Sequence, residues 1–239
     1  VFGCDITADN STTYMSFFSQ MDTYGNGYAG IGVWRAAFKP LVDRIADTDI
    51  RLQWFCCDRS TGVTDASGNR ITLIRDTQSP VAVEYQAVKF IGTGRDNIKA
   101  GVFSGWELGD YIYLRSEEAY MIKMEALAHK SSAEAVTELN SFMKTRQPDY
   151  NYTFTNKADL IEEIIYQKRV EFWGEGLEYI DNRRLNIPVD RTDETWGAEN
   201  NNHFSAGKFR YNQEDRPFLY QLPLSEIENN SQLSPSDQN

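Results

Sequence analysis

The sequence has few of the residues that metal and redox centres require. Its 239 residues include only three cysteines and two histidines. Cys4, Cys56 and Cys57 are odd in number and two are adjacent, which is unlike a disulfide framework, so we expect buried thiols. Neither His129 nor His203 has another histidine or cysteine at ligand spacing. The sequence therefore predicts no metal site and no cofactor.

Basic residues are scarce relative to acidic ones. The 24 Lys and Arg residues against 35 Asp and Glu residues give a formal net charge of -11. Nucleic-acid affinity depends on clustered basic side chains that contact phosphates, so this balance argues against a nucleic-acid partner and favours a neutral or cationic ligand.

Apolar runs in the sequence are short as well. None reaches the roughly 18 residues that indicate a membrane-spanning helix.

Hydrophobic residues are nevertheless plentiful enough for a folded core. They make up 41% of the chain, and aromatic residues make up 13%. From Leu114 to Ala128, apolar and small residues cover most of a helical circumference, which predicts a helix packed on several sides. Ser131 and Glu134 have the spacing of a capping box, and a second, antiparallel helix is predicted from there to a stop at Pro148.

A third helix is predicted after a cap at Thr155 or Asn156. Gly174 and Gly176 allow the chain to turn where this helix ends. Its inward stripe consists of Ile161, Ile164, Ile165 and Phe172.

The N-terminal part is less regular. Residues 1–29 set aromatic side chains among small polar residues and are typical of a loop. A helix is predicted over Val33 to Ile45. Two short β-rich runs, Arg51 to Cys56 and Arg70 to Arg75, are separated by a Ser-, Thr- and Gly-containing stretch and predict a hairpin.

Three glycines in the first loop match a nucleotide-binding pattern. Gly25, Gly27 and Gly30 fit G-x-G-x-x-G just before a predicted helix. In a dinucleotide-binding fold the acidic ribose ligand follows the second strand. Here Asp47 and Asp49 precede the first β-rich run. The context therefore favours a glycine loop that presents tyrosines.

Three motifs follow one another in the helical part of the sequence. The first, LRxAE…LixAEA, is matched by Leu114, Arg115, Glu118, Ile122, Glu125 and Ala126. The second, LNxxRxR, is matched by Leu139, Asn140 and Arg146, with Met143 in place of its first arginine. Gln167 and Glu178 depart from the third, ERxxEFxxEGxRxxDLxR, which is otherwise matched by Arg169, Glu171, Phe172, Glu175, Gly176, Tyr179, Asp181 and Arg184. In these motifs the sequence resembles the SusD/RagB family of surface glycan-binding lipoproteins.

Two shorter stretches extend the resemblance. Thr48 to Arg51 is similar to the family's DxR element, and Leu222 to Asn230 is similar to its closing motif. The motifs cover most of this chain but only the C-terminal half of a family member. Since the first residues also read as the middle of a domain, we expect a fragment whose missing part carried the export signal and the lipidated cysteine.

The resemblance implies a fold and a function. The implied fold is mainly α, with tetratricopeptide-like helix pairs, long loops and a small β-hairpin. We expect one SusD-like domain: a loop-rich region over 1–109, a helical core over 110–185, and an irregular segment over 186–239 that packs back on the helices. The implied function is non-catalytic binding of an oligosaccharide or polysaccharide beside a TonB-dependent transporter, on the extracellular face of the outer membrane.

Glycan binding would need exposed aromatic rings for the C–H faces of sugars and polar side chains for their hydroxyls. Aromatic and polar residues of this kind stand close together in the N-terminal sequence, and Asn10 is a further polar residue there that could bind a sugar hydroxyl. Trp34, inside a predicted helix, is the one most expected to be buried. The predicted ligand-binding residues are Tyr14, Tyr24, Asn26, Tyr28 and Trp34.

Charged residues in the motifs are expected to serve structure. Buried ion pairs commonly serve packing and register, and arginine can satisfy several acceptors at once. The predicted structural network comprises Arg115, Glu118, Glu125, Arg169, Glu175 and Asp181.

Two alternatives remain open from the sequence. A protein-interaction scaffold would use the same helix pairs. A glycosidase would need two carboxylates across a bound sugar, and Glu171 with Glu175 is the most tempting pair. The two residues lie one turn apart on a predicted helix face, where acidic pairs are ordinary, which favours binding over hydrolysis.

Overall fold

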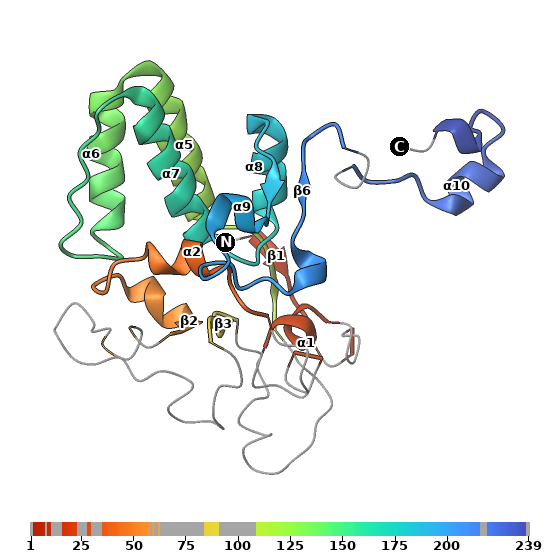
Figure 1. Ribbon diagram of the computed structural model, residues 1–239, viewed down its shortest axis with the longest axis horizontal. Coiled ribbons are helices and arrows are strands. Elements are labelled where there is room, and N and C mark those ends of the chain that lie inside the picture. The colour runs from red at the N-terminus through yellow and green to blue at the C-terminus, as the bar shows by residue number, and fades with distance from the viewer. Residues whose placement is uncertain are drawn as a thin grey trace, which may run out of the picture. The chain divides into compact units, whose positions relative to one another are not determined.

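The computed structural model describes residues 2–7, 9–10, 16–22, 28–29, 35–57, 59, 62, 84–90, 109–215 and 219–237 (Figure 1). The chain forms two compact units, Val1–Glu171 and Phe172–Asn239, which we describe separately. The expected three-part division at residues 110 and 186 stays a prediction. The described residues are mainly helical with small antiparallel strand pairs, so the predicted fold class is confirmed.

Three long helices form the centre of the first unit. They lie side by side in Figure 1: α5 (Ser116–Lys130), α6 (Ser132–Met143) and α7 (Lys157–Glu171). Ser131 alone separates α5 from α6, whereas residues 144–156 form a longer loop between α6 and α7. Apolar side chains from all three meet in the core; they include Met121, Met124, Ala128, Ala135, Leu139, Met143, Leu160, Ile164 and Val170. All three helices were predicted, and their arrangement follows because one apolar face of each must be buried.

Helix α5 differs from its prediction in two respects. It begins at Ser116 rather than near Leu114, because Tyr111–Leu114 forms strand β4 and pairs with strand β1 (Phe2–Cys4). The helix is also buried on one side only: Tyr120 is 50% exposed and Ile122 is 54% exposed. The expectation of a helix packed on several sides is therefore wrong for the described residues.

The predicted caps of the next two helices differ in outcome. Ser131 is the N-cap residue of α6, but its side chain makes no capping hydrogen bond, so the capping box with Glu134 does not form. Asn156 caps α7, since its side-chain oxygen accepts from the backbone N–H groups of Ala158 at 2.8 Å and Asp159 at 3.1 Å.

The N-terminal part of this unit is less helical than predicted. After α1 (Phe17–Met21), helix α2 extends only over Lys39–Asp43, with Pro40 in its first turn. Ala36 instead forms a bridge with Gln86, so the prediction of a helix from Val33 is wrong over 35–38. Extended backbone is favoured there because the N–H of Ala37 donates to the carbonyl of Tyr85.

The first predicted strand is mostly a 3-10 helix. Ile50–Trp54 forms η1, and only Phe55–Cys56 forms a strand, β2. Its partner is β3 (Gln86–Ala87), with Phe55 opposite Ala87. Residues 70–75, the expected second strand, lie outside the described part. Cys56 and Cys57 are buried as expected, whereas Cys4 is exposed, which corrects the expectation of three buried thiols.

The second unit consists of short elements. Gly174 and Gly176 have φ angles of 78° and 84°, which confirms the predicted turn because glycine tolerates this region. The elements are α8 (Leu177–Leu185), β5 (Val189–Asp190), α9 (Asp193–Trp196), η3 (Ser205–Gly207), β6 (Arg210–Tyr211), α10 (Leu224–Asn229) and η5 (Pro235–Asp237). Strands β5 and β6 pair antiparallel, and the side chain of Arg210 lies 2.5 Å from Asp190 Oδ2.

A buried ionic cluster joins the ends of the three long helices to η1. We call it the Glu171 cluster; its members are Asp49, Arg51, Arg115, Arg146, Gln167 and Glu171. Arg51 is only 1% exposed. Its Nη2 lies 2.7 Å from Asp49 Oδ2, and its Nη1 lies 3.5 Å from Glu171 Oε2. This guanidinium therefore ties η1 to α7 inside the core.

Glu171 receives two further arginines. Arg146 donates to both carboxylate oxygens, at 3.0 and 3.3 Å, and Arg115 donates to Oε1 at 2.9 Å. The backbone carbonyl of Glu171 accepts from Arg115 at 2.8 Å and from Lys89 at 2.7 Å. Cations thus satisfy the last carbonyl of α7, where the helix dipole is negative.

Burial and the surrounding charges act in opposite directions on Glu171. Burial would raise the pKa of its carboxyl group, but hydrogen bonds from Arg146 and Arg115 and the charges of Arg146 and Arg51 outweigh burial. The pKa falls from its ordinary value of 4.5 to about 2. Glu171 is therefore ionised throughout the neutral and mildly acidic range.

We predict that Arg51→Met lowers the free energy of unfolding by about 3 to 5 kcal/mol, because it leaves Asp49 buried without its main counter-ion. Urea denaturation measures the change. Lys123→Met is the matched control. It removes an exposed pair with Glu138 at 2.9 Å and should cost less than about 1 kcal/mol. Equal losses in both variants would contradict a central role for Arg51.

We also predict an acid-sensitive contribution from Glu171. Its pKa is lower in the folded than in the unfolded chain, so its contribution is fully present above the unfolded value of 4.5 and disappears as the pH falls toward 2. The contribution is on the order of 3 kcal/mol. Urea denaturation at a series of pH values should show a shallower acid decline for Glu171→Gln than for the wild type, although the variant is less stable at pH 7. Identical declines would show that this carboxylate does not titrate as inferred.

Candidate functional site

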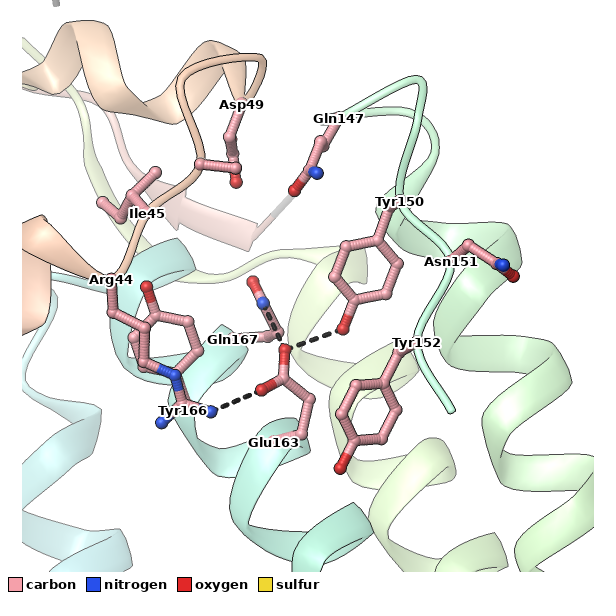
Figure 2. A pocket seen from close by; sticks show the side chains of 11 residues that line it. Arg44, Ile45, Asp49, Gln147, Tyr150, Asn151, Tyr152, Glu163, Tyr166 and Gln167 are labelled. Atoms are coloured by element: carbon pink, nitrogen blue, oxygen red, sulfur yellow. Dashed lines mark hydrogen bonds and ion pairs between the residues drawn. The ribbon is translucent and has the colours of Figure 1, made fainter. Parts of the chain in front are cut away.

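The first unit contains a recess of about 330 Å³ beside helix α7 (Figure 2). This volume is at the small end of the range for ligand pockets. The recess lies between the turn after α2, the loop after α6, and one face of α7. Its main polar and aromatic lining residues are Arg44, Gln147, Tyr150, Tyr152, Glu163 and Tyr166.

Local sequence positions these side chains. Glu163, Tyr166 and Gln167 are spaced at i, i+3 and i+4 on α7, so they share one helix face. Asn140 on α6 holds the loop: its side-chain oxygen accepts from the N–H of Tyr152 at 2.7 Å, and its NH₂ donates to the carbonyl of Tyr152 at 3.0 Å. The loop conformation is therefore fixed by a side chain of the neighbouring helix.

Glu163 lies at the centre of the recess. Tyr150 donates its hydroxyl to Glu163 Oε1 at 2.7 Å, Gln167 donates to the same oxygen at 2.6 Å, and Arg44 lies 2.5 Å from Oε2. Figure 2 shows Tyr150 and Tyr152 on one side of Glu163 and Arg44 and Tyr166 on the other. The carboxylate is thus both neutralised and immobilised.

The tyrosine hydroxyls of the recess remain protonated. Burial, followed by the charge of Glu163 and the hydrogen bond to it, raises the pKa of Tyr150. Burial also raises the pKa of Tyr166, although the charge of Arg44 opposes this. The Arg44 guanidinium lies 3.9 Å from the ring centroid of Tyr166, so it covers one face of that ring. Such tyrosines act as hydrogen-bonding and packing groups, not as bases.

The chemistry of the recess suits binding better than hydrolysis. A glycosidase needs a carboxyl group whose raised pKa lets it donate a proton, opposite a second carboxylate. Glu171, the tempting catalytic residue, has a lowered pKa and is held by three arginines. Glu163 already accepts from three side chains.

Of the five ligand-binding residues predicted from the sequence, the structure describes one. Tyr28 is 44% exposed, and the N–H of the adjacent Ala29 donates to the carbonyl of Ser19 at 3.0 Å. Its ring is thus presented next to an anchored residue. Tyr14, Tyr24, Asn26 and Trp34 lie outside the described residues, and the binding role of all five stays a prediction.

The structure describes all six residues of the predicted structural network. Arg115 faces Glu171 and Glu117, at 2.9 and 3.6 Å, rather than Glu118, which lies one residue further along α5. Glu125 is buried on the same helix and Arg169 is half-buried on α7. In the second unit, Asp181 is buried and accepts from Arg184 at 2.7 Å, while Glu175 is half-buried. Their action as one network stays a prediction.

Sequence reasoning missed the recess. Its aromatic residues lie in and around the stretch Tyr150-Asn151-Tyr152, which alternates aromatic and amide side chains just as the N-terminal loop does. That alternation was the available signal. The approach of Arg44 to Glu163 spans 119 residues and has no local signature.

The described residues can be compared with the requirements of a metal site and of a membrane-spanning helix. Within them, no group of His, Cys, Asp and Glu side chains could hold a metal ion. Likewise, none of the helices in the described part is both long and apolar enough to cross a membrane.

Comparison with known proteins identifies relatives by fold and by family. A crystal structure of a SusD-like carbohydrate binding protein from Bacteroides vulgatus matches with a TM-score of 0.65 and 22% sequence identity. The match covers 97% of this chain and 47% of that one, so the chain spans about half the length of this neighbour. Curated proteins offer no match. The model of the SusD family matches residues 85–239, most of the chain, and we conclude that the chain belongs to the SusD family.

Proposed function

We propose that this chain is part of a non-catalytic carbohydrate-binding protein. Family membership over residues 85–239 carries the proposal. The structural neighbour, a SusD-like carbohydrate binding protein, supports it through a shared fold. The ligand class is an oligosaccharide or polysaccharide.

The partner and the location follow from the same reasoning. The protein works beside a TonB-dependent transporter and passes oligosaccharide to it. It lies on the extracellular face of the outer membrane, held there by a lipid anchor. The net charge of -11 is compatible with a neutral ligand such as a sugar.

The proposed main site is the N-terminal loop region. Tyr28 is 44% exposed and offers a flat apolar face with a polar tip, which suits the C–H face of a sugar ring. Neighbouring glycines at positions 25, 27 and 30 would let the backbone approach a ligand closely. The other predicted residues, Tyr14, Tyr24, Asn26 and Trp34, belong to the same proposed site.

A protein-interaction scaffold is the second candidate. The observation that favours it is that α5 exposes two large apolar side chains, Tyr120 and Ile122, each by at least 50%. Exposed apolar side chains can contribute to contacts with other proteins. The two functions differ in one measurement: only the first requires retention on an insoluble glycan.

We predict that the chain releases no reducing ends from a panel of polysaccharides. The reason is that Glu171 cannot donate a proton while three arginines hold it ionised. A reducing-sugar assay measures this. Release by the wild type that is abolished in folded Glu171→Gln protein would show instead that the chain is a hydrolase.

We also predict that Tyr28→Ala or Tyr24→Ala weakens glycan binding by about 1 kcal/mol or more, the scale of one aromatic contact. Reduced retention in glycan affinity gels measures the change. Lys123→Ala, on the outer face of α5, is the control and should migrate as the wild type does. Retention of the wild type with unchanged tyrosine variants would place the site elsewhere. Failure of the wild type to be retained by any glycan would favour the scaffold function for this chain.

A further inference from the structure

We propose that the recess beside α7 is a second sugar site, separate from the loop site, which takes a single neutral sugar ring. The inference rests on the proposed function for the class of ligand and on the geometry of the recess for its position. Three features carry it: the ring surface of Tyr152, internally balanced charge, and a floor that is rigid before any ligand binds.

The ring surface lies on the loop side of the recess. Tyr152 is half-buried, so part of its ring is available to a ligand while the rest is supported by the fold. Its hydroxyl donates to the carbonyl of Asp159 at 3.0 Å, which fixes the ring orientation. Tyr150 beside it is only 7% exposed and is anchored by its bond to Glu163, so it contributes rigidity rather than ring surface (Figure 2). One fixed, half-buried ring suits the apolar face of a pyranose.

The charge balance selects a neutral ligand. Glu163 is paired with Arg44 at 2.5 Å, and Asp49 is paired with Arg51 at 2.7 Å. A charged ligand would have to compete with one of these pairs, whereas a neutral polyol would not. Gln147 is half-buried and Asn151 is exposed at the rim, and their amides can both donate to and accept from sugar hydroxyls.

The floor of the recess is held by the Glu171 cluster. Gln167 donates to Glu163 at 2.6 Å and accepts a hydrogen bond from Arg51. The side chain that orients Glu163 is therefore fixed by the most deeply buried cation of the fold. A site that is ordered before binding loses less entropy when the ligand arrives, which partly compensates for a small contact area.

The volume limits the ligand. A recess of about 330 Å³ accommodates one sugar ring rather than a chain of several. Contacts of this size give weak binding, in the millimolar range. The site would thus hold a terminal residue or a branch of a glycan whose main contacts lie elsewhere.

Saturation-transfer NMR tests the proposal with D-glucose, D-galactose, D-mannose and D-xylose as probes, and with D-glucuronate as a charged comparison. We expect at least one neutral sugar to bind the wild type, and D-glucuronate to bind more weakly. Tyr152→Ala should weaken the binding about tenfold through loss of the ring contact. Tyr152→Phe retains the ring and should bind within about threefold of the wild type.

Two further variants are controls, one for misfolding and one for nonspecific binding of the sugar. Ala46→Met replaces a small lining side chain in the turn after α2 with a larger one that occupies the recess, so it should also abolish binding while the melting temperature is retained. Tyr120→Ala removes a half-exposed ring on α5, far along the sequence from the recess, and should bind as the wild type does.

The outcomes separate this inference from the proposed function. Absence of binding by every neutral sugar, stronger binding of D-glucuronate, or unchanged binding by Tyr152→Ala and Ala46→Met would each overturn the second site. Retention on an insoluble glycan depends on the loop site, so a protein that is retained but binds no monosaccharide supports the proposed function alone. Monosaccharide binding that is lost in Ala46→Met, without retention on any glycan, supports the recess alone.

Discussion

The carboxylate of Glu171, held by three arginines, is the interaction on which the first unit depends. Arg51, Arg115 and Arg146 come from η1, the start of α5 and the end of α6, and they meet at the last residue of α7. Removing ions from water is costly, and such a cluster is tolerated only when every charge finds good partners. Here the same contacts determine how three helices and a loop are positioned, so stability and geometry have one cause.

The Glu171 cluster also explains why the side chains of the neighbouring recess have fixed positions. Gln167 accepts from Arg51 and donates to Glu163, which also accepts from the buried Tyr150, so one amide side chain links the buried cations to the recess. Gln167 departs from the family motif, which has glutamate at this position. An amide can donate to Glu163, whereas a second carboxylate one turn away would repel it. The substitution and the recess are therefore physically consistent.

The two proposed sugar sites differ in how the fold supports them. The residues proposed for the N-terminal loop site stand among glycines in the sequence, and Ala29, next to Tyr28, is anchored to Ser19. The recess is supported by helix α7 and by the side chain of Asn140. A loop can adapt to the ends and branches of different glycans, while a recess on a helix selects by shape. Both modes suit a binding protein, and neither requires a reactive carboxyl group.

The sequence by itself determined the three long helices and the turn at Gly174 and Gly176, because helical periodicity and glycine conformations are local properties. It also determined the family, through motifs in a fixed order. Tertiary structure alone decided that Arg51 enters a 3-10 helix and reaches Glu171, 120 residues away, and that β2 pairs with β3. It likewise decided that Glu163 and Arg44 meet at the recess. Contacts over such separations depend on how the helices pack, and packing leaves no periodic trace in the residues that it brings together.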